Sequence, residues 1–271
     1  MKEAIEDSLP LALATVPPGI GLLPAPLLHT ESFTVRSSEV DAWATLAVPA
    51  LAAYFQEAAL RHADELGCSI HALMDQGHTW VLVGEHISVL ERIKRGDVLE
   101  VTTWPTGVDR LVLGRDFIAH RQDGVAVAQS STRWLIINQR TRRPARPEKL
   151  LGDGLLALAN TLVQITPPEV DIAAWPIEKR LPVRYEDMDL NAHANHTCYL
   201  AWALEALPEA TWRTWRLASL AVQFLAECLH GGSVISRSAP TSEHEFTHSI
   251  LSAADGRVLA RLATTWVPRE P

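Results

Sequence analysis

The chain has 271 residues, of which 47% are hydrophobic and 21% are charged. These proportions exclude a disordered or fibrous protein and provide enough apolar side chains for one large domain or two ordinary ones. The net charge of −8 argues against general nucleic-acid binding, which needs a basic face.

The N-terminal segment is apolar, but its composition is not that of a membrane helix. Residues 9–28 contain five prolines, a density that disfavours both a membrane span and a signal-peptide core. The preceding residues include Glu3, Glu6 and Asp7, whereas a signal peptide begins with a basic region. We expect residues 1–30 to form an extended tail that packs onto the body, and we expect no membrane span.

The body begins with a short strand-like run and a helix near residues 48–66. Leu51, Phe55 and Ala58 recur at helical spacing, and Gly67 is placed to end the helix. The following segment is rich in Val, Ile, Thr and Trp, and the turn signals "KRGD", "PTG" and "QDG" divide it. One helix followed by antiparallel strands predicts an α+β fold in which the helix covers one face of the sheet.

The second part of the chain repeats the first. Residues 34–58 align without a gap with residues 182–206, and residues 123–134 align with residues 255–266. A second helix is therefore expected near 196–207, and the shorter distance between the two matches indicates deletions in loops. The predicted units are domain 1 at 31–150, a connector at 151–180 that contains Gly and Pro, and domain 2 at 181–271.

A polar run, "DMDLNAHANH" at 187–196, precedes the second helix. If this run is extended, Asp187, Asp189, Asn191 and His193 share one face. In such a row an imidazole can act as a general base, an amide can hold water or an oxyanion, and a carboxylate can orient the imidazole. The alternative is structural, because Asp and Asn before a helix commonly cap it or form turns.

The repeat separates the members of this row. The matching positions in copy one are, in order, Glu39, Asp41, Trp43 and Thr45. Acidic residues recur at the first two positions, so Asp187 is interpreted as a shared scaffold acid and Asp189 as part of both the fold and the site. Asn191 and His193 have no counterparts in copy one, which predicts a single working site in copy two.

A second candidate pair lies in "LAECLHGG" at 225–232. Glu227 matches Glu91 of copy one and has no apolar reason to end a strand. Cys228 is either a nucleophile, if a neighbouring histidine lowers its pKa, or a small buried hydrophobe, as most free cysteines are. The chain has three cysteines and no CxxC pair, which argues against a disulfide framework or a structural zinc site and favours a reducing cytoplasm.

These motifs resemble those of bacterial and plant fatty acyl–acyl-carrier-protein (acyl-ACP) thioesterases. The second half carries the resemblance in "YEDMDLNAHANHTCYLAWALEALP" and "AECLHGG", and the first half in "GHTWVL" and "STRWLIINQRTRRPARP". The resemblance implies two tandem hotdog domains, each a long helix wrapped by an antiparallel sheet, with the two sheets joined into one pseudo-dimer. It also implies hydrolysis of the thioester between a fatty acyl chain and the carrier's phosphopantetheine, without a metal or an organic cofactor.

The resemblance also implies which residues form the site. By position it matches the family's catalytic row and its later acidic–Cys pair to Asp189, Asn191, His193, Glu227 and Cys228. The run "HANH" departs from the family, which commonly has a second Asn where this chain has His196. Two mechanisms stay open: attack by Cys228, or attack by a water that His193 or a carboxylate activates while Asn191 holds the carbonyl or the water. We prefer the water, because hydrolysis needs no covalent intermediate.

The partner that the resemblance implies is acyl carrier protein. This carrier is acidic, so docking needs local positive charge despite the net charge of −8. The densest basic cluster could serve docking or be a solvated linker. It comprises Arg140, Arg142, Arg143, Arg146 and Lys149. The acyl chain is expected to lie in copy one, where Trp43 fills the spare site, and such units also occur as larger homo-oligomers.

Three other functions compete with this interpretation. An acyl-coenzyme A thioesterase would share the fold and the catalytic row, so the sequence separates the two poorly. A non-catalytic acyl-binding protein would have lost part of the candidate set, which here is complete. A hotdog hydratase is disfavoured by the Glu227–Cys228 pair.

Overall fold

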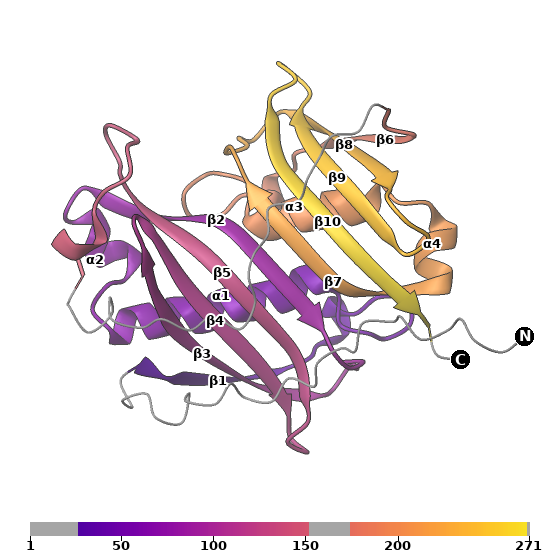
Figure 1. Cartoon of the computed structure of the whole chain (residues 1–271), viewed down its shortest axis with the longest axis horizontal. Coiled ribbons are helices and arrows are strands. Elements are labelled where there is room, and N and C mark those ends of the chain that lie inside the picture. The colour runs from indigo at the N-terminus through magenta and orange to yellow at the C-terminus, as the bar shows by residue number, and fades with distance from the viewer. Residues whose placement is uncertain (1–26, 152–173, 270–271) are drawn as a thin grey trace, which may run out of the picture.

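The computed structural model describes residues 27–151 and 174–269 (Figure 1). Most of the expected N-terminal tail and most of the expected connector lie outside these described residues, so both expectations stay predictions. Within the described ranges, no helix combines the length and the apolar composition that a membrane crossing requires.

Both halves of the chain follow the same order of elements. The first half contains β1 (His29–Thr34), α1 (Val48–Glu65), α2 (Ile70–Met74), β2 (His78–Val89), β3 (Val98–Asp109), β4 (Val112–Arg121) and β5 (Ala126–Asn138). The second half contains β6 (Ile177–Pro182), α3 (His196–Glu205), α4 (Glu209–Thr214), β7 (Trp215–Phe224), β8 (Ser233–Pro240), β9 (Glu245–Ser252) and β10 (Val258–Pro268). The two predicted helices are confirmed as α1 and α3, and Gly67 follows α1 with a φ of 69° that suits a helix end.

The described strands form one antiparallel sheet in the order β1-β3-β4-β5-β2-β7-β10-β9-β8-β6. This order is equivalent when read from either edge, so a pseudo-two-fold axis passes between β2 and β7. Across this junction Glu85 lies opposite Val222 and His86 lies opposite Ala221. The expected α+β fold with two joined sheets is therefore confirmed.

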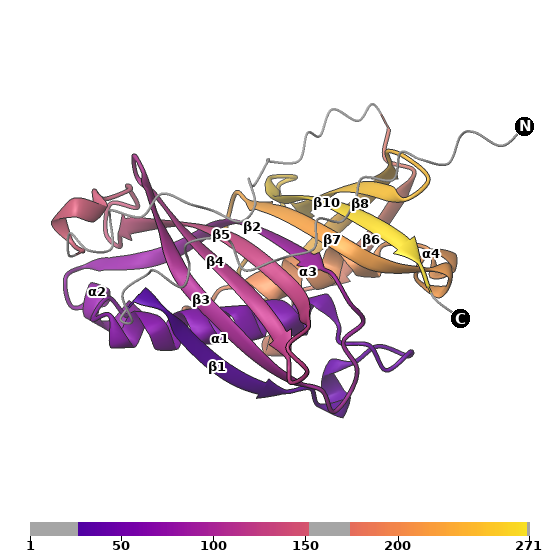
Figure 2. The ribbon, with the colours of Figure 1, turned by 60° about the horizontal axis from the view of Figure 1, so that its bottom comes forward.

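Both long helices pack against the same face of the sheet, where α1 also contacts α3 (Figures 1 and 2). The apolar positions of α1 face the sheet, and Leu51 and Phe55 are each 1% exposed. The ring of Phe55 lies 5.2 Å from that of Phe117 in β4. Burial of each such side chain contributes about 1.5–3 kcal/mol, and Phe55→Ala would cost about 3–5 kcal/mol. Leu200 of α3 belongs to the same core cluster, so the core spans both halves and fixes the position of the loop that precedes α3.

Candidate active site

The polar run before α3 is a tight loop and not an extended strand. A 3₁₀ helix at Tyr185–Asp187 precedes it, and Met188 and Ala194 pair across it. Inside the loop, Oδ1 of Asp189 accepts hydrogen bonds from the backbone N–H groups of Asn191 at 2.8 Å and His193 at 3.2 Å. The prediction of four side chains on one extended face is therefore wrong. The physical reason is that an aspartate carboxylate can bond its own local backbone and so competes with strand formation.

The same loop occurs in copy one. There Oδ1 of Asp41 accepts backbone hydrogen bonds from Trp43 and Thr45, both at 2.9 Å. Each loop contains an alanine with positive φ, 56° at Ala44 and 58° at Ala192. An aspartate that bonds the backbone of its own loop is thus a feature of the fold in both halves. In copy two, the hydrogen bonds of Asp189 fix the loop that carries Asn191 and His193.

Asp187 lies outside the row and is buried, with an exposure of 2%. Its carboxylate accepts hydrogen bonds from the backbone N–H of Arg184 at 2.7 Å and from the Arg184 guanidinium at 2.9 Å. Glu39 accepts the equivalent backbone bond from Arg36 at 2.8 Å. This shared arrangement agrees with the interpretation of Asp187 as a scaffold acid.

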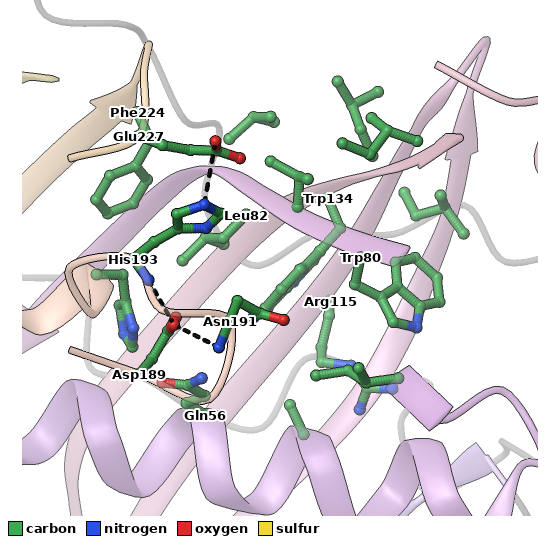
Figure 3. A pocket seen from close by; sticks show the side chains of 18 of the residues that line it. Gln56, Trp80, Leu82, Arg115, Trp134, Asp189, Asn191, His193, Phe224 and Glu227 are labelled. Carbon is green, nitrogen blue, oxygen red and sulfur yellow. Dashed lines mark hydrogen bonds and ion pairs between the residues drawn. The ribbon is translucent and has the colours of Figure 1, made fainter. Parts of the chain in front are cut away.

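His193 and Glu227 meet beside a large cavity (Figure 3). The Nε2 atom of His193 lies 3.4 Å from the Oε2 atom of Glu227. The backbone holds the two segments together, because the N–H of Ala194 donates to the carbonyl of Cys228 at 2.8 Å. Asn191 lines the same cavity, so the structure brings together Asn191, His193 and Glu227 as the sequence predicts.

Cys228 is placed differently from Glu227. It is 8% exposed and belongs to the apolar core cluster, and it is not among the residues that line the cavity. Burial raises the pKa of the Cys228 thiol, which disfavours the nucleophilic thiolate. The geometry of the described residues therefore matches the packing interpretation of Cys228 and not the nucleophile interpretation.

Arg142 reaches the site from the other half of the chain. Its guanidinium forms an ion pair with Oε1 of Glu227. The residue sits in the turn after β5, where its backbone N–H donates to the carbonyl of Asn138 at 2.8 Å. The sequence interpretation gave Arg142 a role in docking or in a solvated linker, and no spacing rule could have paired it with a residue 85 positions away. The other arginines of the cluster, Arg140, Arg143 and Arg146, are exposed.

The cavity has a volume of about 800 Å³, within the range of small-molecule sites. Most of its wall comes from copy one and is apolar, with Leu60 of α1, Trp80 and Leu82 of β2, and Trp134 of β5. Trp43, which was expected to fill the spare site of copy one, does not line this cavity. Its ring packs against Trp212 and under the guanidinium of Arg269, and the filling of a spare site stays a prediction.

A partly buried cation also faces this cavity, and it was not foreseen from the sequence. Arg115 of β4 lines the wall, and its guanidinium contacts a ring nitrogen of His62 at 3.0 Å and donates to the hydroxyl of Thr103 at 3.1 Å. Burial lowers the pKa of Arg115 to about 10. Among the described residues, no group of three or more His, Cys, Asp or Glu side chains is arranged to hold a metal ion.

Sequence comparisons place these residues in a known context. The model of the acyl-ACP thioesterase N-terminal domain matches residues 26–151, and that of the C-terminal domain matches residues 173–268. The chain is 26% identical to the chloroplastic oleoyl-acyl carrier protein thioesterase 1 of Arabidopsis thaliana over 275 aligned positions. It is also 26% identical to a chloroplastic palmitoyl-acyl carrier protein thioesterase of Cuphea hookeriana. These alignments cover 89% and 90% of this chain, but 76% and 63% of the respective relatives.

Solved structures agree on the fold. An acyl-ACP thioesterase from Bacteroides thetaiotaomicron superposes with a TM-score of 0.80 at 24% identity, covering 89% of this chain and 98% of that one. The 12:0-ACP thioesterase from Umbellularia californica gives a TM-score of 0.77 at 22% identity, covering 90% of this chain and 98% of that one. At these identities the likeness concerns the fold alone, whereas the two domain models together match most of the chain. The chain belongs to the acyl-ACP thioesterase family.

Proposed function

We propose that this protein hydrolyses fatty acyl-ACP to free fatty acid and carrier protein, as part of fatty acid biosynthesis. The observation that carries the proposal is the contact between His193 and Glu227 beside an apolar cavity of about 800 Å³ that Asn191 also lines. Membership of the family supports it, as do the names of the plant relatives, which are acyl carrier protein thioesterases.

In the proposed mechanism, His193 is the general base. Both oxygens of Glu227 already face partners, Oε1 the Arg142 guanidinium and Oε2 the His193 ring. Oδ1 of Asp189 is likewise occupied by two backbone N–H groups. Glu227 therefore orients the imidazole through Nε2 and stabilises the imidazolium, which leaves Nδ1 of His193 to take a proton from the attacking water.

The rest of the reaction follows from this proton transfer. The water oxygen bonds to the thioester carbonyl carbon, and the Asn191 amide donates to the oxygen on which negative charge develops. The carbon–sulfur bond then breaks, and the proton held by His193 passes to the sulfur. The products are the fatty acid and the free thiol of the carrier's phosphopantetheine arm.

The experiment that tests this function compares two carriers with one acyl chain. Steady-state hydrolysis is measured on acyl-ACP and on acyl-coenzyme A of the same chain length, with wild type and with Asn191→Ala. We expect kcat/KM to be higher for acyl-ACP, and we expect Asn191→Ala to lose most of the activity on both substrates. Equal or faster hydrolysis of the coenzyme A thioester would favour the competing acyl-coenzyme A thioesterase, and no hydrolysis of either would contradict the proposal.

We further propose that the exposed arginines after β5 dock the carrier. Arg142 and Pro144 line the cavity, so Arg140, Arg143 and Arg146 lie in the segment that borders its mouth. The acidic carrier would be attracted there despite the net charge of −8. Arg142 is left intact in the test because it also pairs with Glu227.

Charge reversal separates this docking from the chemistry. The double variant Arg143→Glu/Arg146→Glu is expected to raise the KM for acyl-ACP while the KM for acyl-coenzyme A stays the same. The control is Arg213→Glu on α4, an exposed arginine in the other half of the chain. An unchanged KM for acyl-ACP in the double variant would reject docking at this segment.

The cellular setting is a proposal of the same kind. We propose that the protein works in a reducing compartment, the cytoplasm, because Cys68, Cys198 and Cys228 are all free thiols. The association of several copies into a homo-oligomer stays a prediction.

A further inference from the structure

A second pair of ionisable side chains lies beside the cavity, apart from His193 and Glu227. Glu85 of β2 is 1% exposed, and its Oε1 accepts a hydrogen bond from the hydroxyl of Ser130 at 3.2 Å. Its Oε2 is buried and has no hydrogen-bond partner within the described part of the chain. The Nε2 atom of His196, the first residue of α3, lies 3.9 Å from that oxygen, and His196 lines the cavity.

The fold does not need polar groups at these two places. The strand pairings relate Glu85 to Leu220, because Glu85 lies opposite Thr132 of β5 as Leu220 lies opposite Thr264 of β10. The repeat that relates Asp41 to Asp189 likewise relates Val48, the first residue of α1, to His196. The other half of the molecule therefore packs the same junction with leucine and valine.

The polar pair is thus an addition, and it has an energetic cost. A buried polar atom without a partner destabilises a fold by about 1–3 kcal/mol. In native structures such atoms call for an explanation, and one explanation is a ligand or water that completes the hydrogen bonding. Of the two residues, His196 lines a cavity large enough for a ligand and Glu85 contacts it from the core, so a group entering that cavity can bond the imidazole of His196.

Both members of the pair are uncharged at neutral pH. Burial raises the pKa of Glu85 to about 8 and lowers the pKa of His196 to about 4. The wall therefore offers the neutral imidazole of His196, backed by an uncharged Glu85, and an imidazole can donate or accept a hydrogen bond without presenting net charge. Such a wall suits an uncharged polar substituent on an otherwise apolar chain.

The pair is also close to the reacting centre. Three residues of extended chain span at most about 10 Å, which bounds the distance between the Cα atoms of His193 and His196. The ring of His196 packs edge-on against Phe224 at 6.3 Å, and Phe224 is three residues from Glu227. A substituent that reaches His196 is therefore attached near the thioester and not near the far end of the acyl chain.

We propose that Glu85 and His196 form a polar subsite that selects acyl chains carrying a hydroxyl group near the thioester. In this subsite His196 contacts the hydroxyl, and Glu85 is a positioning residue that acts through His196. A site built to bond a substrate hydroxyl discriminates strongly against the analogue that lacks it, since its own polar groups are then left unpaired. The inference rests on the proposed thioesterase function and adds the substrate class.

The test uses three acyl-ACP substrates of one chain length: saturated, 3-hydroxy and ω-hydroxy. The variants His196→Val and Glu85→Leu copy the residues that the other half carries at these places, so they are expected to fold. Glu85→Gln keeps the hydrogen-bonding capacity and serves as the conservative variant. Thermal melts of all variants accompany the kinetics.

We expect wild type to prefer the 3-hydroxy over the saturated substrate by at least about tenfold in kcat/KM, which corresponds to about 1.4 kcal/mol. His196→Val should remove that preference while its rate on the saturated substrate stays close to that of wild type. Glu85→Leu should weaken the preference, and Glu85→Gln should restore most of it. The ratio between the ω-hydroxy and saturated substrates should not change in any variant.

Three outcomes would overturn the subsite. One is a wild type without preference for the 3-hydroxy chain. Another is the same preference in His196→Val as in wild type, and the third is a parallel loss on all three substrates, which indicates a structural role. These outcomes leave the proposed function intact, whereas failure of wild type to hydrolyse any of the substrates would contradict the function itself.

Discussion

The Nε2 atom of His193 lies 3.4 Å from the Oε2 atom of Glu227, and this contact joins the loop before α3 to the segment after β7. The other oxygen of Glu227 pairs with Arg142 from the first half. The carboxylate is thus held between an imidazole and a guanidinium, in a geometry that orients His193 toward the cavity. The candidate site is therefore assembled from both halves of the chain, although its candidate base and amide come from the second half alone.

The first prediction concerns the role of Glu227 in orienting His193. Glu227→Gln keeps the size of the side chain but removes the charge that supports an imidazolium, so kcat should fall by roughly 10²-fold or more while KM changes little. The sequence match of Glu91 with Glu227 is wrong by one position, because Leu46 N–H donates to Ile93 as Ala194 N–H donates to Cys228, which places Arg92 at the position of Glu227. Glu91→Gln, an exposed glutamate next to that position, serves as the control and should behave like wild type. Steady-state kinetics on acyl-ACP measure both variants, and a Glu227→Gln enzyme within threefold of wild-type kcat would contradict the assigned role.

The second prediction concerns Cys228. Because the thiol is buried and its pKa is raised, Cys228→Ala should retain a substantial share of the activity and lose about 1 kcal/mol of stability through the small cavity left behind. Acid-quenched turnover followed by intact-mass analysis of wild type should show no acyl group on the protein. Complete inactivity of a folded Cys228→Ala, together with an acyl adduct on wild-type Cys228, would establish the nucleophile mechanism instead.

The third prediction concerns Asp189, which shapes the loop through two backbone hydrogen bonds. Asp189→Ala and Asp41→Ala should each destabilise the protein by about 1 kcal/mol, because equivalent bonds are lost in the two halves. Only Asp189→Ala should also lower kcat, since Asn191 and His193 lie on its loop. Thermal melts and kinetics distinguish the two effects.

An amide substitution then separates shape from chemistry at this position. Asp189→Asn keeps an oxygen that can accept the two backbone N–H groups, so it should retain most of the activity that Asp189→Ala loses. If Asp189→Asn is folded but as inactive as Asp189→Ala, the carboxylate takes part in the reaction directly.

The fourth prediction is a pH dependence of stability that arises from Glu85. Burial raises its pKa from 4.5 to about 8, so between these values the folded state binds a proton that the unfolded state has released. The free energy of unfolding should therefore decrease as the pH rises through this window, by roughly 5 kcal/mol at most. Below pH 4.5 both states are protonated and the effect is absent.

Glu85→Gln isolates this effect because a neutral amide cannot ionise. The difference in unfolding free energy between Glu85→Gln and wild type should grow in favour of the variant from pH 4.5 to pH 8 and then stay constant. His196, with its pKa lowered to about 4 in the folded state, contributes its own pH dependence when it is released on unfolding, but this contribution is the same in both proteins and cancels in the difference. Urea unfolding at a series of pH values gives the difference, and a difference independent of pH would contradict the buried, neutral state of Glu85.

The features that the sequence predicts well are those that depend on local patterns or on the repeat. The spacing of Leu51, Phe55 and Ala58 predicts α1, because one helix face must be apolar to cover the sheet. The match between Asp41 and Asp189 predicts that the carboxylate belongs to the fold, and both loops make the same backbone bonds. A repeat reveals such shared roles because equivalent positions in the two copies have the same structural surroundings.

The features that the sequence misses depend on contacts between distant segments. Arg142 lies within a charge cluster that indicates a surface, and only the folded chain brings it to Glu227. Nothing in the sequence distinguishes Arg115 from other strand residues, yet its place in β4 makes it part of the cavity wall. The extended form expected for 187–193 fails for a local reason, because Asp189 bonds the backbone of its own loop more readily than a strand partner could.

The central claim is that copy two carries the general base of a thioester hydrolase and that copy one does not. The release of free fatty acid from acyl-ACP by His193→Ala and by Thr45→Ala, its counterpart in copy one, tests this claim most directly. We expect kcat to fall by roughly 10²–10⁴-fold in His193→Ala and to stay near the wild-type value in Thr45→Ala, with both proteins folded. A folded His193→Ala that releases fatty acid at the wild-type rate, or an equal loss in both variants, would contradict the claim.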